Sequence, residues 1–462
     1  MIPTESPNFV LPRGIRVAAS RDRHWTVWDI DRSWLAPLLV LFLLKQLFLV
    51  VIVGPFAGHD EVDHFWYADR LARGHGLGVI GSVDLPAQAA PYRRYVADYP
   101  TNAEVIQPPL YHALAAPLLW LVPGGVLADL YALRLVAVGL GAVVVWLAYL
   151  TARLLFPTEP LLRAGVPLFV AFQPQFSFEA AIVNHDILVI ALASVVLYLG
   201  LLGVRDGIRP RDATHLGLVV AAGLWTKTSF GLLLPIVAGA VLFAWWDGPR
   251  GARALGLALI RAVGVPAVLM LPWFARSYWH YGDPTGAGRL AAIPGFGEQA
   301  QSYGEMLTAP GFWRQILEDF WGNYGWRQVP FDPETFRAIW LTWGVAVAGL
   351  LVAAARAAVG WRRPGLTPFQ RRGLLLVVMK VLLMAFGVLY VGTIQFTQAR
   401  FAFPAMIGIG MISLLGLKGW LPARARAGAL PLLLAALMGL NVLVTLRFLL
   451  PFYTGAAGII DP

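Results

Sequence analysis

Residues 33–64 read SWLAPLLVLFLLKQLFLVVIVGPFAGHDEVDH, a long apolar run followed at once by a charged stretch. The run from Ser33 to Val53 is long enough to cross a bilayer, which requires about 20 apolar residues. The stretch Gly58–Tyr67 then carries three carboxylates and two imidazoles. Charges this dense are costly in hydrocarbon, so we expect them at the water interface or along a polar cavity.

The composition is that of a membrane protein. Of the 462 residues, 58% are hydrophobic and 13% are charged, whereas soluble domains have about 25% charged residues. The chain has no cysteine, which excludes disulfides and thiolate metal sites. Its net charge of +10 does not indicate nucleic-acid binding, because Arg and Lys gather in the cytoplasmic turns of membrane proteins. We therefore expect membrane lipids, and no nucleic acid, among its partners.

Hydropathy and charge together predict an all-α, polytopic integral membrane protein with about 11 transmembrane helices. The apolar run 110–121 is bracketed by prolines and glycines. We assign it to an interfacial helix, because a span there would move the basic cluster at 205–211 to the outside. Outward spans are then expected at 33–53, 164–180, 213–225, 255–274, 373–393 and 428–449, and inward spans at 131–152, 184–204, 229–246, 338–355 and 401–417.

Three segments follow from this topology. The Arg-rich residues 1–33 predict a cytoplasmic N-terminal tail, and residues 406–462 are expected to form C-terminal transmembrane helices with a short external tail. Residues 34–405 are expected to form the main transmembrane module, with long external loops at 55–129 and 275–337. The second loop is rich in aromatic residues, which suit either an interfacial belt or a surface that binds lipid or sugar.

Asp60 and Glu61 begin a predicted amphipathic helix, because residues 61–73 carry apolar side chains at helical spacing and are followed by Gly74. Asp60 can cap this helix, since Asp63 follows three residues later as in a capping box. Alternatively, Asp60 or Glu61 accepts a proton from a hydroxyl nucleophile as a general base. The residues alone leave both interpretations open.

Metal binding is a third interpretation of the same stretch. His59 with Asp63, and Asp60 with His64, are four residues apart, so each pair can share one face of a helix. Such spacing is common by chance. We therefore expect no metal cofactor, although a divalent ion is kept as an alternative.

Further charged residues are predicted on the same side of the membrane as Asp60. Asn184-His185-Asp186 opens one inward span, Lys227 precedes another, and Arg400 precedes a third. Asp186 suits a helix cap, and the two cations suit either contacts with lipid headgroups or a clamp on a phosphate. Other candidates are Arg134 and Arg276 on that side, and Lys45 and Lys380, which are predicted within spans and should be functional or paired.

Taken together, these residues resemble the GT-C superfamily of membrane glycosyltransferases over roughly residues 35–405. Asp60 to Phe65 resembles the acidic motif after the first span of protein O-mannosyltransferases. Pro108-Pro109-Leu110-Tyr111 resembles a segment of bacterial members that include the lipid A aminoarabinose transferase. A poorly characterised branch of bacterial predicted membrane proteins shares features resembling Arg134-Leu135, Asn184-His185-Asp186, Thr226-Lys227, Tyr281-Gly282-Asp283-Pro284 and Ala399-Arg400-Phe401 with Pro404.

The resemblance implies an inverting transfer of a sugar from a polyprenyl-phosphate donor. It assigns the catalytic base to Asp60, with Glu61 as its support, although the reverse is also allowed. It implies that Lys227 and Arg400 stabilise the charge on the leaving phosphate, with Arg134 behind them. Further substrate-binding residues are expected to be Asp186, His64 and Tyr111. Relatives that use monophosphate donors generally need no metal, but Asp186 matches a second acidic site of metal-dependent relatives.

The expected function is thus glycosyl transfer to a lipid, glycan or protein acceptor at the outer face of a bacterial cytoplasmic membrane. A transporter or flippase of a polyprenyl-linked lipid is the alternative from another class, and it would require charges along a pathway to both sides. A glycan polymerase or ligase is a further alternative that the residues do not exclude.

Overall fold

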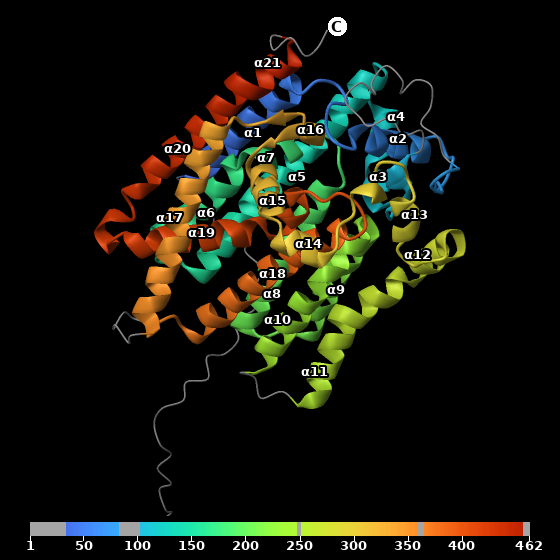
Figure 1. Ribbon diagram of the computed structural model, residues 1–462. Coiled ribbons are helices and arrows are strands. Elements are labelled where there is room, and N and C mark those ends of the chain that lie inside the picture. Colours follow the sequence, from blue (N-terminus) through green and yellow to red (C-terminus); the bar gives the residue numbers. More distant parts are fainter. Residues whose placement is uncertain (1–33, 83–101, 247–250, 359–364, 456–462) are drawn as a thin grey trace, which may run out of the picture.

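The computed structural model describes residues 34–82, 102–246, 251–358 and 365–455, and these residues are mostly helical. The one strand found there, β1 (Val329–Pro330), bridges to Asn323 and Tyr324. The predicted all-α class is therefore confirmed (Figure 1). The predicted tail 1–33 and the last residues of the predicted C-terminal tail, 456–462, lie outside the described residues.

Nine segments of the described chain are helices long and apolar enough to cross a membrane, which supports a multi-pass membrane protein. Each corresponds to a predicted span. They are α1 (Leu35–Ile52), α5 (Val126–Leu155), α8 (Asp186–Asp206), η3 (Thr228–Leu233) with α10 (Leu234–Trp246), α11 (Ala252–Leu259) with η4 (Ile260–Gly264) and α12 (Val265–Tyr281), α17 (Pro333–Ala358), α18 (Pro368–Gly392), η6 (Ala399–Ala405) with α19 (Met406–Trp420), and α20 (Ala429–Val444) with η8 (Thr445–Leu449) and α21 (Leu450–Tyr453).

The two remaining predicted spans are shorter helices. α9 (Pro210–Thr226) has 17 residues and α6 (Pro160–Phe172) has 13. The prediction of one continuous helix over 164–180 is wrong, because the chain turns at Gln173, whose φ of −67° and ψ of 119° are extended. A proline disfavours the helical conformation of the residue before it, and Pro174 then begins the short helix α7 (Pro174–Glu179).

α8 lies at the centre of the bundle, where it packs against α5, α9, α10 and η6. Of the most apolar 18 residues of α8, 72% are buried, against 17% for the corresponding windows of α17 and of the α20–α21 segment. The latter helices lie at the edge of the bundle in Figure 1. Asp186, the first residue of α8, is therefore held by the most buried of the nine candidate spans in the described chain.

The two long predicted loops fold into short helices. The first contains α2 (Glu61–Ala72), η2 (Ala103–Ile106), α3 (Leu110–Ala115) and α4 (Leu118–Leu121), and the second contains α13 (Ala287–Ala291), η5 (Gly297–Gln299), α14 (Tyr303–Thr308), α15 (Pro310–Trp321) and α16 (Tyr324–Arg327). In Figure 1, α2, α3, α4 and α13 gather at one end of the bundle. A small apolar core joins the loops there, with Tyr67 and Ile106 from the first against Ile293 and Phe296 from the second.

The aromatic residues of the second loop serve two different purposes. Phe320 and Trp321 are buried, and both rings pack against Trp343 of α17. Trp279 at the end of α12 is 85% exposed instead. Some of the aromatic residues predicted to form an interfacial belt or a binding surface are therefore buried, and they hold the second loop against the bundle.

Candidate functional site

Asp60 stands immediately before α2 with a left-handed backbone, at φ 56° and ψ 2°. Aspartate enters this region more readily than most residues. Its side chain accepts no hydrogen bond from the first turn of α2, so the capping interpretation is wrong. The carboxylate instead accepts a hydrogen bond from Arg400 Nη2 at 2.7 Å, and Asp60 is only 8% exposed.

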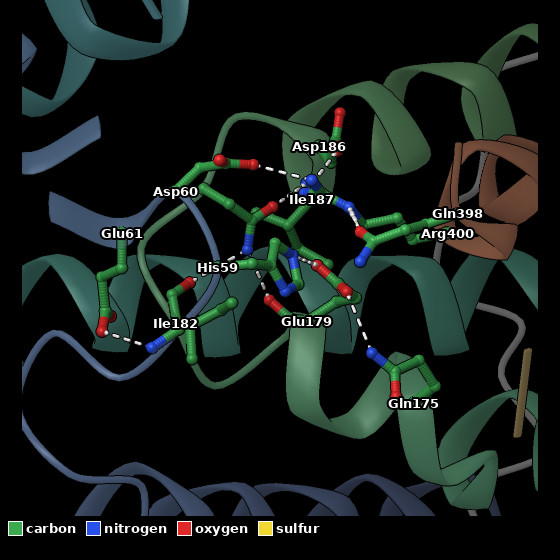
Figure 2. Close-up of polar contacts among 12 residues, drawn as sticks. His59, Asp60, Glu61, Gln175, Glu179, Ile182, Asp186, Ile187, Gln398 and Arg400 are labelled. Carbon is green, nitrogen blue, oxygen red and sulfur yellow. Dashed lines mark hydrogen bonds and ion pairs between the residues drawn. The ribbon is translucent and has the colours of Figure 1, made fainter. Parts of the chain in front are cut away.

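Asp60 begins a chain of alternating charges that includes Arg400, Asp186 and Lys227. Arg400 Nη1 lies 3.5 Å from Asp186 Oδ2, and Lys227 Nζ donates to Asp186 Oδ1 at 2.6 Å. Arg400 Nε also donates to Gln398 Oε1 at 2.7 Å. Figure 2 shows Asp60, Asp186 and Arg400 turned toward one another from separate segments. The four charges sum to zero, which is how ionised groups can remain at a largely buried site.

Asp60, Lys227 and Arg400 lie at breaks between α-helices, and Asp186 is the first residue of α8. Lys227 follows α9, where the backbone is extended at φ −154° and ψ 129°. Arg400 lies in η6, a short 3-10 segment between α18 and α19. Asn184 accepts a hydrogen bond from the Ile187 amide at 2.9 Å and thereby caps the start of α8 next to Asp186. Breaks in apolar helices thus bring polar side chains to one place.

Glu61 makes a different set of contacts from its neighbour Asp60. Its two oxygens accept from Arg134 Nε at 2.9 Å and from Arg134 Nη2 at 2.7 Å, a bidentate pair. Glu61 also accepts from the backbone amides of Val183 and Gly58. Both Glu61 and Arg134 are 0% exposed. In Figure 2, Glu61 points away from the group formed by Asp60 and Arg400.

A cavity of about 350 Å³ opens beside the charged chain. Its charged and imidazole lining consists of Asp60, His64, Glu104, His185, Asp186, Lys227 and Arg400. Much of its apolar lining comes from two elements, with Phe230, Leu232 and Leu233 from η3 and Met384, Tyr390 and Val391 from α18. The cavity therefore combines one connected charged group with an apolar wall.

An imidazole cluster adjoins the charged chain. His64 Nδ1 lies 3.1 Å from His112 Nε2, and His185 Nδ1 lies 3.2 Å from Glu104 Oε2. Burial lowers the pKa of His64 and of His112 well below the ordinary value. Burial raises the pKa of Glu104, but His64 and His185 outweigh it and hold that pKa at about 2. Burial and Lys227 lower the pKa of His185, whereas Glu104 and Asp186 raise it, and the net shift is upward.

Of the described residues expected in the site, Asp60, Asp186, Lys227, Arg400 and His64 line the cavity, whereas Glu61, Arg134 and Tyr111 do not. Arg134 also donates to the carbonyls of Val50 and Val53, so its donors are used inside the bundle. Tyr111 is buried, and its ring centroid lies 6.4 Å from that of His64. Arg276 donates to the Gly78 carbonyl, outside the lining.

The two intramembrane lysines have partners within the bundle. Lys45 Nζ donates to the Ala171 carbonyl and to Ser177 Oγ. Lys380 Nζ donates to the Ala193 carbonyl at 2.6 Å. Both lysines therefore tie helices together through hydrogen bonds inside the bundle.

Several residues that the sequence did not single out complete the site. Glu179 at the end of α7 pairs with His59 Nε2 at 3.0 Å, a partner that the predicted pairing of His59 with Asp63 did not include. Glu104 and His112 lie in the first loop, and Gln398 orients Arg400. The acidic residue three positions before Gln107-Pro108-Pro109, and the histidine just after Tyr111, were available signals in the sequence.

Comparison with known proteins agrees with this architecture. Residues 107–274 match the family model described as dolichyl-phosphate-mannose-protein mannosyltransferase. No curated protein matches the chain. The oligosaccharyltransferase of Archaeoglobus fulgidus tethered with an acceptor peptide containing the NVT sequon aligns at 13% identity with a TM-score of 0.50, over 89% of this chain and 55% of its own. ArnT of Cupriavidus metallidurans bound to undecaprenyl phosphate aligns at 14% identity with a TM-score of 0.48, over 94% of this chain and 66% of its own.

The chain thus covers 55% and 66% of those two solved chains. At such low identity, the alignment with the oligosaccharyltransferase bears on the fold alone. The family model adds a match in sequence that contains His112, Asp186 and Lys227. Together, the matched family and the shared fold confirm that this chain resembles the GT-C superfamily of membrane glycosyltransferases, and within it the protein mannosyltransferases.

Proposed function

We propose that this protein is an inverting glycosyltransferase that transfers a sugar from a polyprenyl-phosphate donor to an acceptor hydroxyl. We place the reaction at the outer face of a bacterial cytoplasmic membrane, because the site lies on the side opposite the basic turns predicted to be cytoplasmic. The observation that carries the proposal is the chain Asp60–Arg400–Asp186–Lys227 at a cavity with an apolar wall.

The residues that line the cavity support this donor chemistry. A polyprenyl phosphate joins a long apolar chain to a compact anion, and the wall from η3 and α18 suits the first part. Arg400 and Lys227 suit the second, because guanidinium groups bind phosphate oxygens in pairs and ammonium groups act as point charges. The description of the matching family names dolichyl-phosphate-mannose, which is a donor of this class.

The proposed step uses Asp60 as the base. The acceptor hydroxyl loses its proton to the Asp60 carboxylate while its oxygen bonds to the anomeric carbon. The bond from that carbon to the phosphate oxygen breaks, and its electron pair stays on the phosphate. Lys227 and Arg400 stabilise the charge that develops there, which is the kind of interaction that lowers a barrier most. The products are the glycosylated acceptor and polyprenyl phosphate, and the proton on Asp60 returns to water.

Glu61 and Arg134 act as positioning residues in this proposal. Their bidentate pair joins α2 to α5, and Arg134 also bonds the carbonyls that end α1. They thereby hold the turn from which Asp60 reaches the cavity. Asp186 holds both cations, so the arriving phosphate must compete with it for their donors.

The test is a transfer assay with purified protein in lipid nanodiscs, a panel of polyprenyl-phosphate sugars and a mixed acceptor extract. We expect one donor to be consumed, polyprenyl phosphate to be released, and the product to have the opposite anomeric configuration by NMR. Asp206→Asn, a change in an exposed pair with Arg205, serves as the control that keeps activity. Retained configuration would overturn the inverting mechanism. Movement of labelled lipid across vesicles without any sugar transfer would support the flippase alternative instead.

A further inference from the structure

Three histidines from separate segments bring one ring nitrogen each within 4.8 Å of the others. His64 comes from α2, His112 from α3, and His185 from the residue before α8. Glu104 of η2 adds a carboxylate oxygen, 3.2 Å from His185 Nδ1 and 3.9 Å from His64 Nδ1. Sequence spacing did not indicate this group, because its members lie on four different elements.

The cluster is enclosed but its polar atoms are poorly satisfied. The three histidines are 1%, 0% and 2% exposed, in chain order. Within the described residues, His185 Nδ1 and Glu104 Oε2 have no hydrogen-bond partner, although they face each other. Buried polar atoms are nearly always satisfied by a protein group, water or ion. A bound cation would satisfy both atoms, as would a proton on His185 shared with Glu104.

The donor set and its dimensions match a transition metal. Three imidazole nitrogens with one carboxylate oxygen are ligands that zinc takes in tetrahedral sites. Ligand atoms around one such ion, bound at about 2.0–2.2 Å, lie about 3.3–3.6 Å from each other. Three of the six separations among these donors, 3.1, 3.2 and 3.9 Å, lie near that value. The three imidazole nitrogens lie within 4.8 Å of one another, so they would draw closer around a bound ion. Imidazole ligands favour zinc and its neighbours over magnesium or calcium, which take oxygen.

A second contact supports this arrangement. His185 Nε2 lies 3.3 Å from Asp186 Oδ1, so the ring is held through its other nitrogen by a carboxylate. Histidines that bind metals are usually oriented in this way. The alternative group of Asp60, His64 and Glu104 is less suited to a cation, because Asp60 already pairs with Arg400.

We propose that His64, His112, His185 and Glu104 bind one divalent transition-metal ion, with Zn²⁺ as the first candidate. The ion ties α2, η2 and α3 of the first loop to the start of α8. It thereby holds Asp60 and Asp186, which flank the cluster, at a constant separation. In this proposal His64 binds the metal ion, and it does not make the contact with substrate that was expected from the sequence. Metal binding is independent of the proposed transfer and is measured without any sugar.

The test is the metal content of full-length protein purified with a tag that contains no histidine. After equilibration with zinc and dialysis, we expect about one Zn²⁺ per chain by plasma mass spectrometry. His112→Ala and His185→Ala should each lose most of this zinc. His280→Ala removes an exposed histidine of α12 and should keep it. Zinc retained equally by all three variants would overturn the assignment, as would wild-type protein without bound zinc.

A spectroscopic measurement on the wild-type chain guards against variants that fail to fold. Replacement of zinc by Co²⁺ should give the visible absorption of a tetrahedral ion with nitrogen and oxygen ligands. That absorption should fall as Zn²⁺ is added back, because both ions occupy one site. No visible band, or a band that Zn²⁺ leaves unchanged, would reject a metal site at these residues.

Discussion

Asp60 and Glu61 are neighbours in the sequence, yet they occupy two different regions of the molecule. Glu61 is fully buried, and a bidentate arginine and two backbone amides use both of its oxygens. Asp60 lines the cavity and has one ion pair through Oδ2. Two carboxylates one residue apart can therefore differ completely in the chemistry open to them. The left-handed turn at Asp60 directs the two side chains to separate places.

The comparison is tested most strongly by Asp60→Asn. The amide keeps the size of the side chain but cannot accept the proton, and loss of a general base typically lowers the rate about 10²- to 10⁴-fold. We expect that decrease in turnover while donor binding is retained. Thermal stability should fall as well, because an amide cannot neutralise the buried Arg400 guanidinium as the carboxylate does. Turnover within a factor of a few of the wild type, in a folded variant, would remove Asp60 from the role of base.

The matching change in the other region is Arg134→Ala. It leaves the Glu61 charge buried without its partner, and breaking such a pair costs about 3–5 kcal/mol. We therefore expect a large drop in the melting temperature of the detergent-solubilised protein. Tryptophan fluorescence measures this unfolding. The double variant Arg134→Ala with Glu61→Ala should recover part of that loss, because no uncompensated charge remains. If Arg134→Ala has the same melting temperature as the wild type, the Arg134–Glu61 pair does not stabilise the fold.

The smallest effect is expected from an exposed ion pair at the C-terminal end of α2, the helix that Glu61 begins. Arg73 Nε lies 2.7 Å from Asp69 Oδ2, but the arginine side chain is 63% exposed. Such pairs contribute about 0.3–0.5 kcal/mol in helices, since water screens them. Arg73→Ala should change neither melting temperature nor turnover measurably. A marked loss would mean that burial is not what separates the structural pairs from the others.

Much of the scaffold was predictable because long apolar runs have few alternatives to membrane helices. The spans predicted at 33–53 and 184–204, for example, correspond to α1 (Leu35–Ile52) and α8 (Asp186–Asp206), with ends that differ by one or two residues. The span predicted at 164–180 failed at Gln173, where the following proline decided the backbone. Local backbone chemistry therefore outweighed hydropathy at that position.

The candidate site was predictable only in part. Topology placed Asp60, Asp186, Lys227 and Arg400 on one side, and the structure brings these four together. Topology could not place Arg134, which shares that side but bonds to Glu61 inside the bundle. Nor could it join His112 to His185, because their contact depends on how the first loop folds over α8. Side chains that meet across distant segments have no signature in local spacing.

The most direct test of the account is a structure of the Asp60→Asn variant with an intact polyprenyl-phosphate sugar, since this variant should bind the donor without consuming it. We predict that the phosphate contacts Lys227 and Arg400, that the lipid follows the wall from η3 and α18, and that the side chain at position 60 faces the anomeric carbon from the side opposite the phosphate. A phosphate bound away from both cations, or an anomeric carbon out of reach of position 60, would contradict the account.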